Sequence, residues 1–471
     1  MAKAKKAPLS EIDVEFEAVD LGDARRNARL RALAARISAS PAESFPRLVT
    51  SIAEREALYR LLNNEAVTWQ AVLEPHIAAT VDRSTSQGLI RVVHDTTDFI
   101  FSGDRDGMGP VMQSTLGFLG HFALAVGGTE ARVPLGVVGL EPYARPRVKR
   151  GGSLNARKLA ARKAPRAEKE SSRWERTALA VSRRFAKGDV IHVMDQEADD
   201  YVLLSELQRA ELRFVVRGTS ARLLEQEGPN IQSVLDEHRG RVFRAVPLSR
   251  RAPARAAKNR KAHPPRNERV ADLRLRWCPL TIAKPQHAQT DVAEISLWCV
   301  QVFEPAPPEG EVPIVWTLLT SERVDSLEAA TAVVDHYRAR WRIEEYFRSL
   351  KQGCAVQKRQ LESYDTMLTA LAIFIPIAWR LLTLRSMGQA HGTQPASVVL
   401  DDAELAGLRI LIADKRCYRL PPRPTVRDAM LAIASLGGHI PNNGEPGWIV
   451  LGRGFEDVLK AAIVWRAARK K

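Results

Sequence analysis

The sequence contains few cysteines, and their spacing argues against the sites that this residue usually builds. Only four occur among 471 residues, and no two of them form a C-x-x-C pair. They are Cys278, Cys299, Cys354 and Cys417. We therefore expect neither a structural zinc site nor a disulfide framework, and we expect a reducing compartment.

The chain also lacks the features of exported and membrane-bound proteins. Its opening residues, M-A-K-A-K-K-A-P, contain no apolar segment of the kind found in secretory signals. The most apolar stretch, from Met367 to Trp379, is too short to span a bilayer and contains Pro376. We find no internal repeat. These absences predict a soluble cytoplasmic protein, and the length allows two or three domains.

Positive charge is the most prominent feature of the composition. The formal net charge is +15, which indicates a polyanionic partner. Two runs contain no acidic residue: Arg145 to Arg166 has nine lysines and arginines, and Arg239 to Arg266 has ten. Such runs are typical of solvated loops. In a DNA-binding protein they would contact phosphates in a salt-sensitive manner that does not depend on base sequence.

Residues from about 88 to 216 alternate between strand and helix patterns. The expected strands are 89–94, 122–126, 133–140, 190–194 and 212–216, and the expected helices are 168–184 and 198–208. Three strands, a helix, a strand, a helix and a strand form the order of a ribonuclease-H-like fold, which makes the fold class mixed α/β. Asp95 would end the first strand and Asp195 the fourth.

Helices are expected on both sides of this core, and a β-rich insertion within it. Residues 12 to 74 have helical apolar spacing and many arginines, among them Arg25, Arg26, Arg29 and Arg60. Apolar and polar residues alternate in Arg269–Trp277 and Glu294–Val302, inside an insertion at about 220–320. We therefore expect three domains: helical 1–74, a core over 75–385 and helical 386–471.

One stretch, His336 to Gly353, contains no interrupting Pro or Gly and predicts a single helix. At about 100° per residue, four polar-tipped residues would fall within one wedge of roughly 60°. They are Tyr337, Arg340, Glu344 and Lys351. An apolar stripe of Ile343, Phe347, Leu350 and Cys354 would lie beside them. The alternative is a surface helix with ordinary i,i+4 charge pairs.

The spacing Tyr, two residues, Arg, three residues, Glu, six residues, Lys resembles the signature of the insertion-sequence-four family of DDE transposases. The adjoining W-R-I-E-E is similar to the Tn-five branch of that family. Other blocks resemble it too: D-L-G-D-A-R-R-N-A-R-L (20–30), A-L-Y-R (57–60), H-D-T-T (94–97), D-Q-E-A-D (195–199), I-V-W-T-L-L-T-S-E (314–322) and A-M-L-A-I-A-S-L-G-G (429–438). Gln196 replaces the usual Arg. The blocks cover most of the chain.

The resemblance implies a role for each matching residue. Asp95, Asp195 and Glu344 would hold two Mg²⁺ ions, for which Mn²⁺ can substitute, because Mg²⁺ prefers oxygen ligands. Asp98, Asp199 and Glu345 lie outside the aligned positions. The other implied site residues are Tyr337, Arg340 and Lys351 at the phosphate, Arg217 near the scissile bond, Trp316 as a base-stacking residue 21 positions before Tyr337, and Arg25, Arg26, Arg29, Arg60 and Arg342 on DNA.

The family's reaction is cut-and-paste transposition through a DNA hairpin, by a homodimer bound to the transposon ends. Two other readings remain open at this point. One is a DNA-binding derivative that no longer cuts, and the other is a ribonuclease-H-like nuclease without strand transfer. The last helix, expected at about 454–470, would either pair with a second subunit or cap its own domain.

Overall fold

The computed structural model describes residues 12–112, 115–128, 132–147, 165–253, 264–413, 418–440, 442 and 444–469. The chain forms two compact units. Unit 1 combines residues 1–152 with residues 341–471, and unit 2 is the continuous segment 153–340. Much of both basic runs (148–164 and 254–263) and Cys417 lie outside the described residues.

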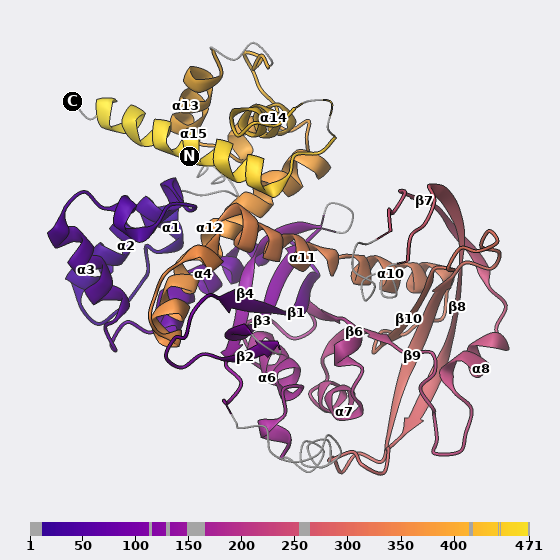
Figure 1. Cartoon of the computed structure of the whole chain (residues 1–471). Coiled ribbons are helices and arrows are strands. Elements are labelled where there is room, and N and C mark those ends of the chain that lie inside the picture. Colours follow the sequence, from indigo (N-terminus) through magenta and orange to yellow (C-terminus); the bar gives the residue numbers. More distant parts are fainter. Residues whose placement is uncertain are drawn as a thin grey trace. The chain divides into compact units, whose positions relative to one another are not determined.

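Unit 1 begins with four helices, and capping side chains set the starts of the last three (Figure 1). They are α1 (Ile12–Glu15), α2 (Ala24–Ala39), α3 (Ile52–Leu62) and α4 (Trp69–Ser84). Asp23 caps α2 by accepting hydrogen bonds from the backbone N–H groups of Arg25 and Arg26, and Ser51 and Thr68 cap α3 and α4.

An antiparallel sheet follows in unit 1. Its strands are β1 (Ile90–Phe101), β2 (Gly109–Met112), β3 (Thr115–Gly127) and β4 (Val133–Tyr143). β1 lies on one side of β3, and β2 and β4 pair with its other side. The expected end of the first strand at Asp95 is wrong, because β1 pairs with β3 as far as Phe101. The rings of Phe99 and Phe118 stack with centroids 4.9 Å apart and hold this extension in place.

One long helix, α12 (Tyr364–Ala390), lies in the core of unit 1. The sequence predicts helix after Gln360, and the most apolar stretch within it from Met367 to Trp379. The helix is long and apolar enough to cross a membrane by length and composition, but its apolar window is wholly buried in the protein. It packs on α4 and β4, and the indole Nε1 of Trp379 donates to the carbonyl of Pro134 at 2.9 Å. Pro376 lies within the helix.

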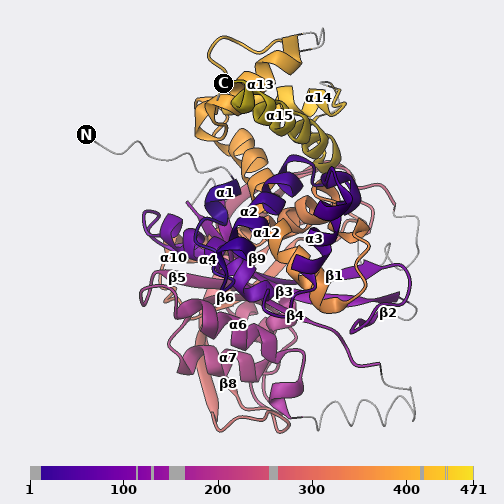
Figure 2. The ribbon, with the colours of Figure 1, turned by 90° about the vertical axis from the view of Figure 1, so that its left-hand side faces the viewer.

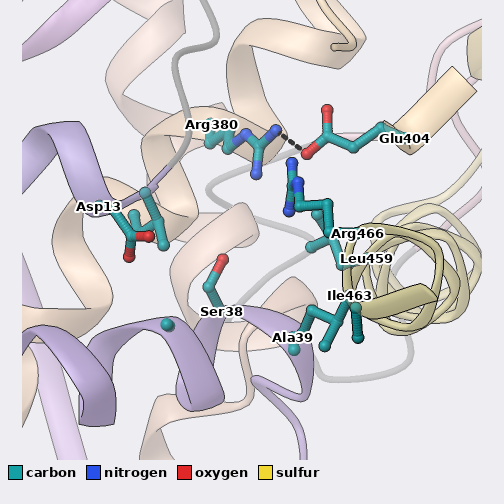
Figure 3. A pocket seen from close by; sticks show the side chains of 11 residues that line it. Asp13, Ser38, Ala39, Arg380, Glu404, Leu459, Ile463 and Arg466 are labelled. Atoms are coloured by element: carbon teal, nitrogen blue, oxygen red, sulfur yellow. Dashed lines mark hydrogen bonds and ion pairs between the residues drawn. The ribbon is translucent and has the colours of Figure 1, made fainter. Parts of the chain in front are cut away.

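Three helices complete unit 1: α13 (Asp402–Ala413), α14 (Val426–Leu436) and α15 (Trp448–Arg469) (Figure 2). α14 and α15 meet backbone to backbone, since a Cβ on Gly454 would lie 1.7 Å from the carbonyl oxygen of Ile433. Figure 3 shows the buried ion pair of Arg380 on α12 and Glu404 on α13. It lines a cavity of about 340 Å³ bounded also by α1, α2 and α15.

Unit 2 contains one sheet in the strand order β5, β6, β10, β9, β8, β7. The bounds are β5 (Val190–Met194), β6 (Arg213–Gly218), β7 (Arg241–Leu248), β8 (Arg269–Ala283), β9 (Glu294–Phe303) and β10 (Val315–Thr320). β5 and β6 are parallel and the other pairs are antiparallel. The helices are α6 (Ser172–Ser182), α7 (Tyr201–Arg209), α8 (Ile231–Asp236) and α10 (Leu327–Arg338).

The strand predicted at 190–194 is confirmed at both ends, and the β-rich insertion is confirmed by β7 to β10. β8 alternates between buried and exposed residues over most of its length, as its sequence pattern predicted. The core of unit 2 gathers apolar side chains from α7, β6, β8 and β9. Cys278 and Cys299 face one another across β8 and β9 in this core as free thiols, in agreement with the expected absence of disulfides between them.

The free energy of unfolding is expected to decrease as the pH is lowered, because of His192, which is buried in β5. Burial lowers the pKa of His192 from its ordinary value of 6.5 to about 4. In the unfolded chain His192 is therefore protonated below pH 6.5, whereas in the folded chain it stays neutral down to about pH 4. Between pH 7.5 and pH 5.0 this difference removes about 2 kcal/mol from the free energy of unfolding.

Urea denaturation at these two pH values measures the effect. The variant His192→Gln should lose about 2 kcal/mol less than the wild type between pH 7.5 and pH 5.0. The exposed His287 serves as the control, since His287→Gln should behave as the wild type does. Equal pH dependence in wild type and His192→Gln would contradict the assignment.

Candidate catalytic site

Aromatic packing brings two of the predicted carboxylates onto contacting elements of unit 1. Asp95 lies in the middle of β1 directly opposite Phe122 of β3, so both side chains leave the same face of the sheet. Phe122 contacts Tyr346 and Phe347 of α11 (Trp341–Arg348), with ring centroids 5.9 and 5.5 Å apart. α11 therefore covers the face that carries Asp95, and it also carries Glu344.

The stretch from His336 to Gly353 is not the single helix that its composition predicts. α10 ends at Arg338, α11 begins at Trp341, and a π-helical turn follows at Ser349–Gly353. The reason lies in packing: α10 packs on the strands of unit 2, whereas α11 packs on β1 of unit 1. The predicted wedge is thus divided between the units. The apolar stripe of Ile343, Phe347, Leu350 and Cys354 is buried, as predicted.

Two of the predicted cations in unit 1 are held by carboxylates. The Nζ of Lys351 lies 2.6 Å from Oδ1 of Asp98 and 5.6 Å from the centre of the Phe99 ring. Nη1 of Arg342 lies 2.5 Å from Glu345, and its Nε donates to the carbonyl of Arg132. Asp98 and Glu345 therefore act as partners of these cations.

In unit 2, two predicted residues lie at the ends of two parallel strands. Asp195 follows β5, and its Oδ1 accepts a hydrogen bond from Glu197 N at 2.9 Å in the short 3-10 helix Gln196–Ala198. Arg217 lies on β6, one residue beyond the register pair of Met194 and Val216. Parallel strands end at the same edge of a sheet, so both residues lie at that edge. Gln196 is exposed beside them.

Tyr337 is buried within the same group. Burial raises the pKa of its hydroxyl, while the positive charges of Arg340 and Arg217 and a hydrogen bond with Arg217 act in the opposite direction. The negative charge of Asp195 raises it further. The hydroxyl therefore stays protonated at neutral pH and can donate a hydrogen bond. The ring of the half-buried Trp316 on β10 meets the Tyr337 ring edge-on at 5.4 Å.

The remaining predicted DNA contacts lie on the first helices. Arg25 and Arg29 of α2 and Arg60 of α3 are exposed, and Arg26 is half-buried.

Asp199, the third carboxylate left out of the metal shell, is held by Arg222 and by the backbone N–H of Thr219. It is therefore occupied within unit 2.

The chemistry of the predicted donor set fits a divalent ion, since Asp95, Asp195 and Glu344 supply the oxygen ligands that Mg²⁺ and Mn²⁺ take. Asp95 and Glu344 belong to unit 1 and Asp195 belongs to unit 2. Among the residues that the structure describes, no three His, Cys, Asp or Glu side chains are clustered closely enough to hold a metal ion. The binding of a metal ion by all three carboxylates is therefore taken up below as a proposal.

Two segments of the chain match known protein families. Residues 11–67 match the family described as "Transposase DNA-binding" and residues 162–375 match "Transposase DDE domain". The chain is a DDE transposase. As such it is a metal-dependent DNA-cleaving enzyme with a ribonuclease-H-like core, it uses divalent ions, and its partner is DNA.

The matched segments of this transposase contain most of the site residues. The first contains Arg25, Arg26, Arg29 and Arg60, and the second contains Asp195, Arg217, Trp316 and all four signature residues. Asp95 precedes the second segment. The sequence did not predict the ion pair of Lys351 with Asp98, because the two residues are 253 positions apart.

A solved structure that resembles the transposase is entitled "Cryo-EM structure of piggyBac transposase synaptic complex with hairpin DNA (SNHP)". The TM-score is 0.37 and the identity 12%, over 81% of this chain and 72% of that one.

Proposed function

We propose that this transposase moves its element by cut-and-paste, as the Tn-five branch of the insertion-sequence-four family does. It binds the transposon ends, frees a 3′ hydroxyl, converts each end to a hairpin, opens the hairpin and joins the 3′ ends to target DNA. The observation that carries the proposal is the packing of α11, with Glu344, on the face of β1 that carries Asp95. Asp195 would complete the set from the end of β5.

The protein's own side chains have separate tasks in this mechanism. Asp95, Asp195 and Glu344 would hold two Mg²⁺ ions, which when bound supply an activated water and neutralise charge on the phosphate. Arg340 and Arg217 would hold non-bridging phosphate oxygens, and the protonated Tyr337 would donate a hydrogen bond to a terminal phosphate. Lys351, positioned by Asp98, would contact the flanking strand. Trp316 would receive a flipped base.

The domain assignment follows the same resemblance. Residues 1–74 would bind the transposon end, residues 75–385 would cut and join DNA, and residues 386–471 would pair two subunits in the complex of paired ends. The exposed apolar side chains of Ile463 and Val464 on α15 suit a helix that pairs with a second subunit. The activity belongs at the nucleoid of a bacterial cytoplasm.

A labelled duplex made from the DNA that flanks the gene tests the proposal. With Mg²⁺, denaturing gels should show nicked DNA first, then hairpin, then a double-strand break, and a plasmid target should capture the released end. A DNA-binding derivative would bind the duplex without any nick. A nuclease without strand transfer would nick it and give neither hairpin nor joined product.

The N-terminal arginines are expected to read the transposon end. The triple change of Arg25, Arg26 and Arg29 to alanine should lower affinity for the flanking duplex more than affinity for a random duplex, because an end-binding surface is lost. The salt dependence of log K should become shallower by roughly 0.9 for each phosphate contact removed. Binding titrations at several salt concentrations measure both quantities.

The matched control removes three exposed arginines of unit 2: Arg239, Arg250 and Arg251. This variant should lose affinity for both duplexes alike. If the two triple variants lost the same affinity for both DNAs, the N-terminal helices would not be the part that recognises the end.

A further inference from the structure

A cleft of about 480 Å³ lies between the α3–α4 connection and the first turns of α12. Its polar lining includes Asn63, Asn64, Glu65, Gln70 and Asp365, and its floor includes Leu62 and Val67. Asn63, Asn64 and Gln70 are exposed. All of these residues belong to unit 1, and none belongs to the catalytic site described above.

Two asparagines line this cleft, and each uses its side-chain oxygen in a hydrogen bond within the protein. Oδ1 of Asn63 accepts from the Thr366 hydroxyl at 2.6 Å, and Oδ1 of Asn64 accepts from Ala66 N at 2.9 Å. Within the described part of the chain, neither amide NH₂ group takes part in a hydrogen bond. Each asparagine therefore keeps both amide N–H donors available, on a side chain whose position is fixed by the bond to its oxygen.

The surroundings favour a base edge over a phosphate as the occupant. Asn63 and Asn64 lie within the matched transposase DNA-binding segment, directly after the helix that carries the exposed Arg60. The carboxylates of Glu65 and Asp365 line the same cleft and would repel a phosphate group. Carboxamides are side chains that recognise base edges, and their N–H donors fit the N7 acceptor that both purines present in the major groove.

We propose that this cleft reads purine edges of the transposon-end duplex, with Asn63 and Asn64 as the specificity-determining donors. Arg60, one turn before them, positions the duplex through its backbone, and the asparagines distinguish the end from other DNA. The inference rests on the proposed function, since it requires that the protein recognise transposon ends.

Competition binding tests it with Asn63→Ser and Asn64→Ser, which remove the amide N–H donors; at position 64 the serine hydroxyl can still accept from Ala66 N. The probes are the duplex flanking the gene and a scrambled duplex of the same composition. Each variant should lower the preference for the flanking duplex by roughly 5- to 100-fold and leave affinity for the scrambled duplex and the salt slope unchanged. The exposed Asn267, changed to serine, is the control and should alter neither.

Single 7-deazapurine substitutions in the flanking duplex remove N7 and identify the contact. At one or more positions the substitution should weaken the wild type and leave the asparagine variant unaffected. If a serine variant fails to fold, Asn64→Asp keeps the acceptor for Ala66 N and removes the donor.

The outcomes separate the inference from the proposed function. The cleft inference is overturned if both asparagine variants keep the wild-type preference for the flanking duplex while the Arg25, Arg26 and Arg29 variant loses it. The proposed function would then still hold. A wild type without preference for the flanking duplex would overturn the proposed end recognition, and the cleft inference with it.

Discussion

Replacing Asp195 by alanine is expected to abolish nicking of the flanking duplex while leaving its binding largely intact. Asp195 follows β5 at the strand end shared with Arg217, far in sequence from the N-terminal arginines. Loss of a metal ligand removes several kcal/mol of charge stabilisation in the transition state, which corresponds to a roughly thousandfold or greater loss of rate. Asp95→Ala and Glu344→Ala should have the same effect. Single-turnover nicking and a binding titration on the same preparation measure it.

The exposed Asp189, immediately before β5, provides the matched control. Asp189→Ala should cut at the wild-type rate, because it removes a carboxylate next to the same strand without touching the site. Persistent Mg²⁺-dependent cleavage by any of the three site variants would rule out the assigned carboxylates.

Trp316→Ala is expected to separate hairpin formation from nicking. The first nick needs no flipped base, whereas the hairpin bends the end tightly and strains its base stack. Stacking a flipped base on an aromatic ring contributes on the order of 1–3 kcal/mol. The hairpin rate should therefore fall roughly ten- to a hundredfold while nicked DNA accumulates. The half-buried position of Trp316, with its ring against the Tyr337 edge, leaves part of the indole open to such a base.

The competing explanation is that Trp316 only fills space in unit 2. Truncation would then destabilise the protein by about 3–5 kcal/mol and lower binding, nicking and hairpin formation together. A melting curve recorded beside the gel assay decides between the two, and Trp316→Phe should restore much of the hairpin rate because it keeps an aromatic face.

The sequence predicted the site residues of unit 2 better than those of unit 1. Val190–Met194 is a short, continuous apolar run followed by the polar D-Q-E-A-D, so both the strand and the position of Asp195 at its end could be predicted. β1 was misjudged because H-D-T-T is polar and suggested a strand end. Its continuation to Phe101 depends on pairing with β3, and in particular on Phe118 opposite Phe99, which no local pattern shows.

The interruption of the signature helix could not be predicted for a related reason. No breaker residue occurs between Tyr337 and Glu344, and helix propensity alone favours a continuous helix. What interrupts it is packing, because α10 packs on strands of unit 2 and α11 packs on β1 of unit 1. The ion pair of Lys351 with Asp98 likewise depends on tertiary packing, which a spacing rule along one helix cannot contain.

The discontinuity of unit 1 in sequence has a consequence during synthesis of the protein. Residues 1–152 must wait for residues 341–471 before their unit is complete, and α12 supplies the missing core. At roughly 5–20 residues per second, the ribosome needs roughly 10–40 s to make the ~190 residues in between. For that time the apolar surface of α4 and β4 that α12 will cover is open. We therefore expect nascent chains stopped before α12 to depend on chaperones, and unit 2 to be the first part of the enzyme to reach its final fold.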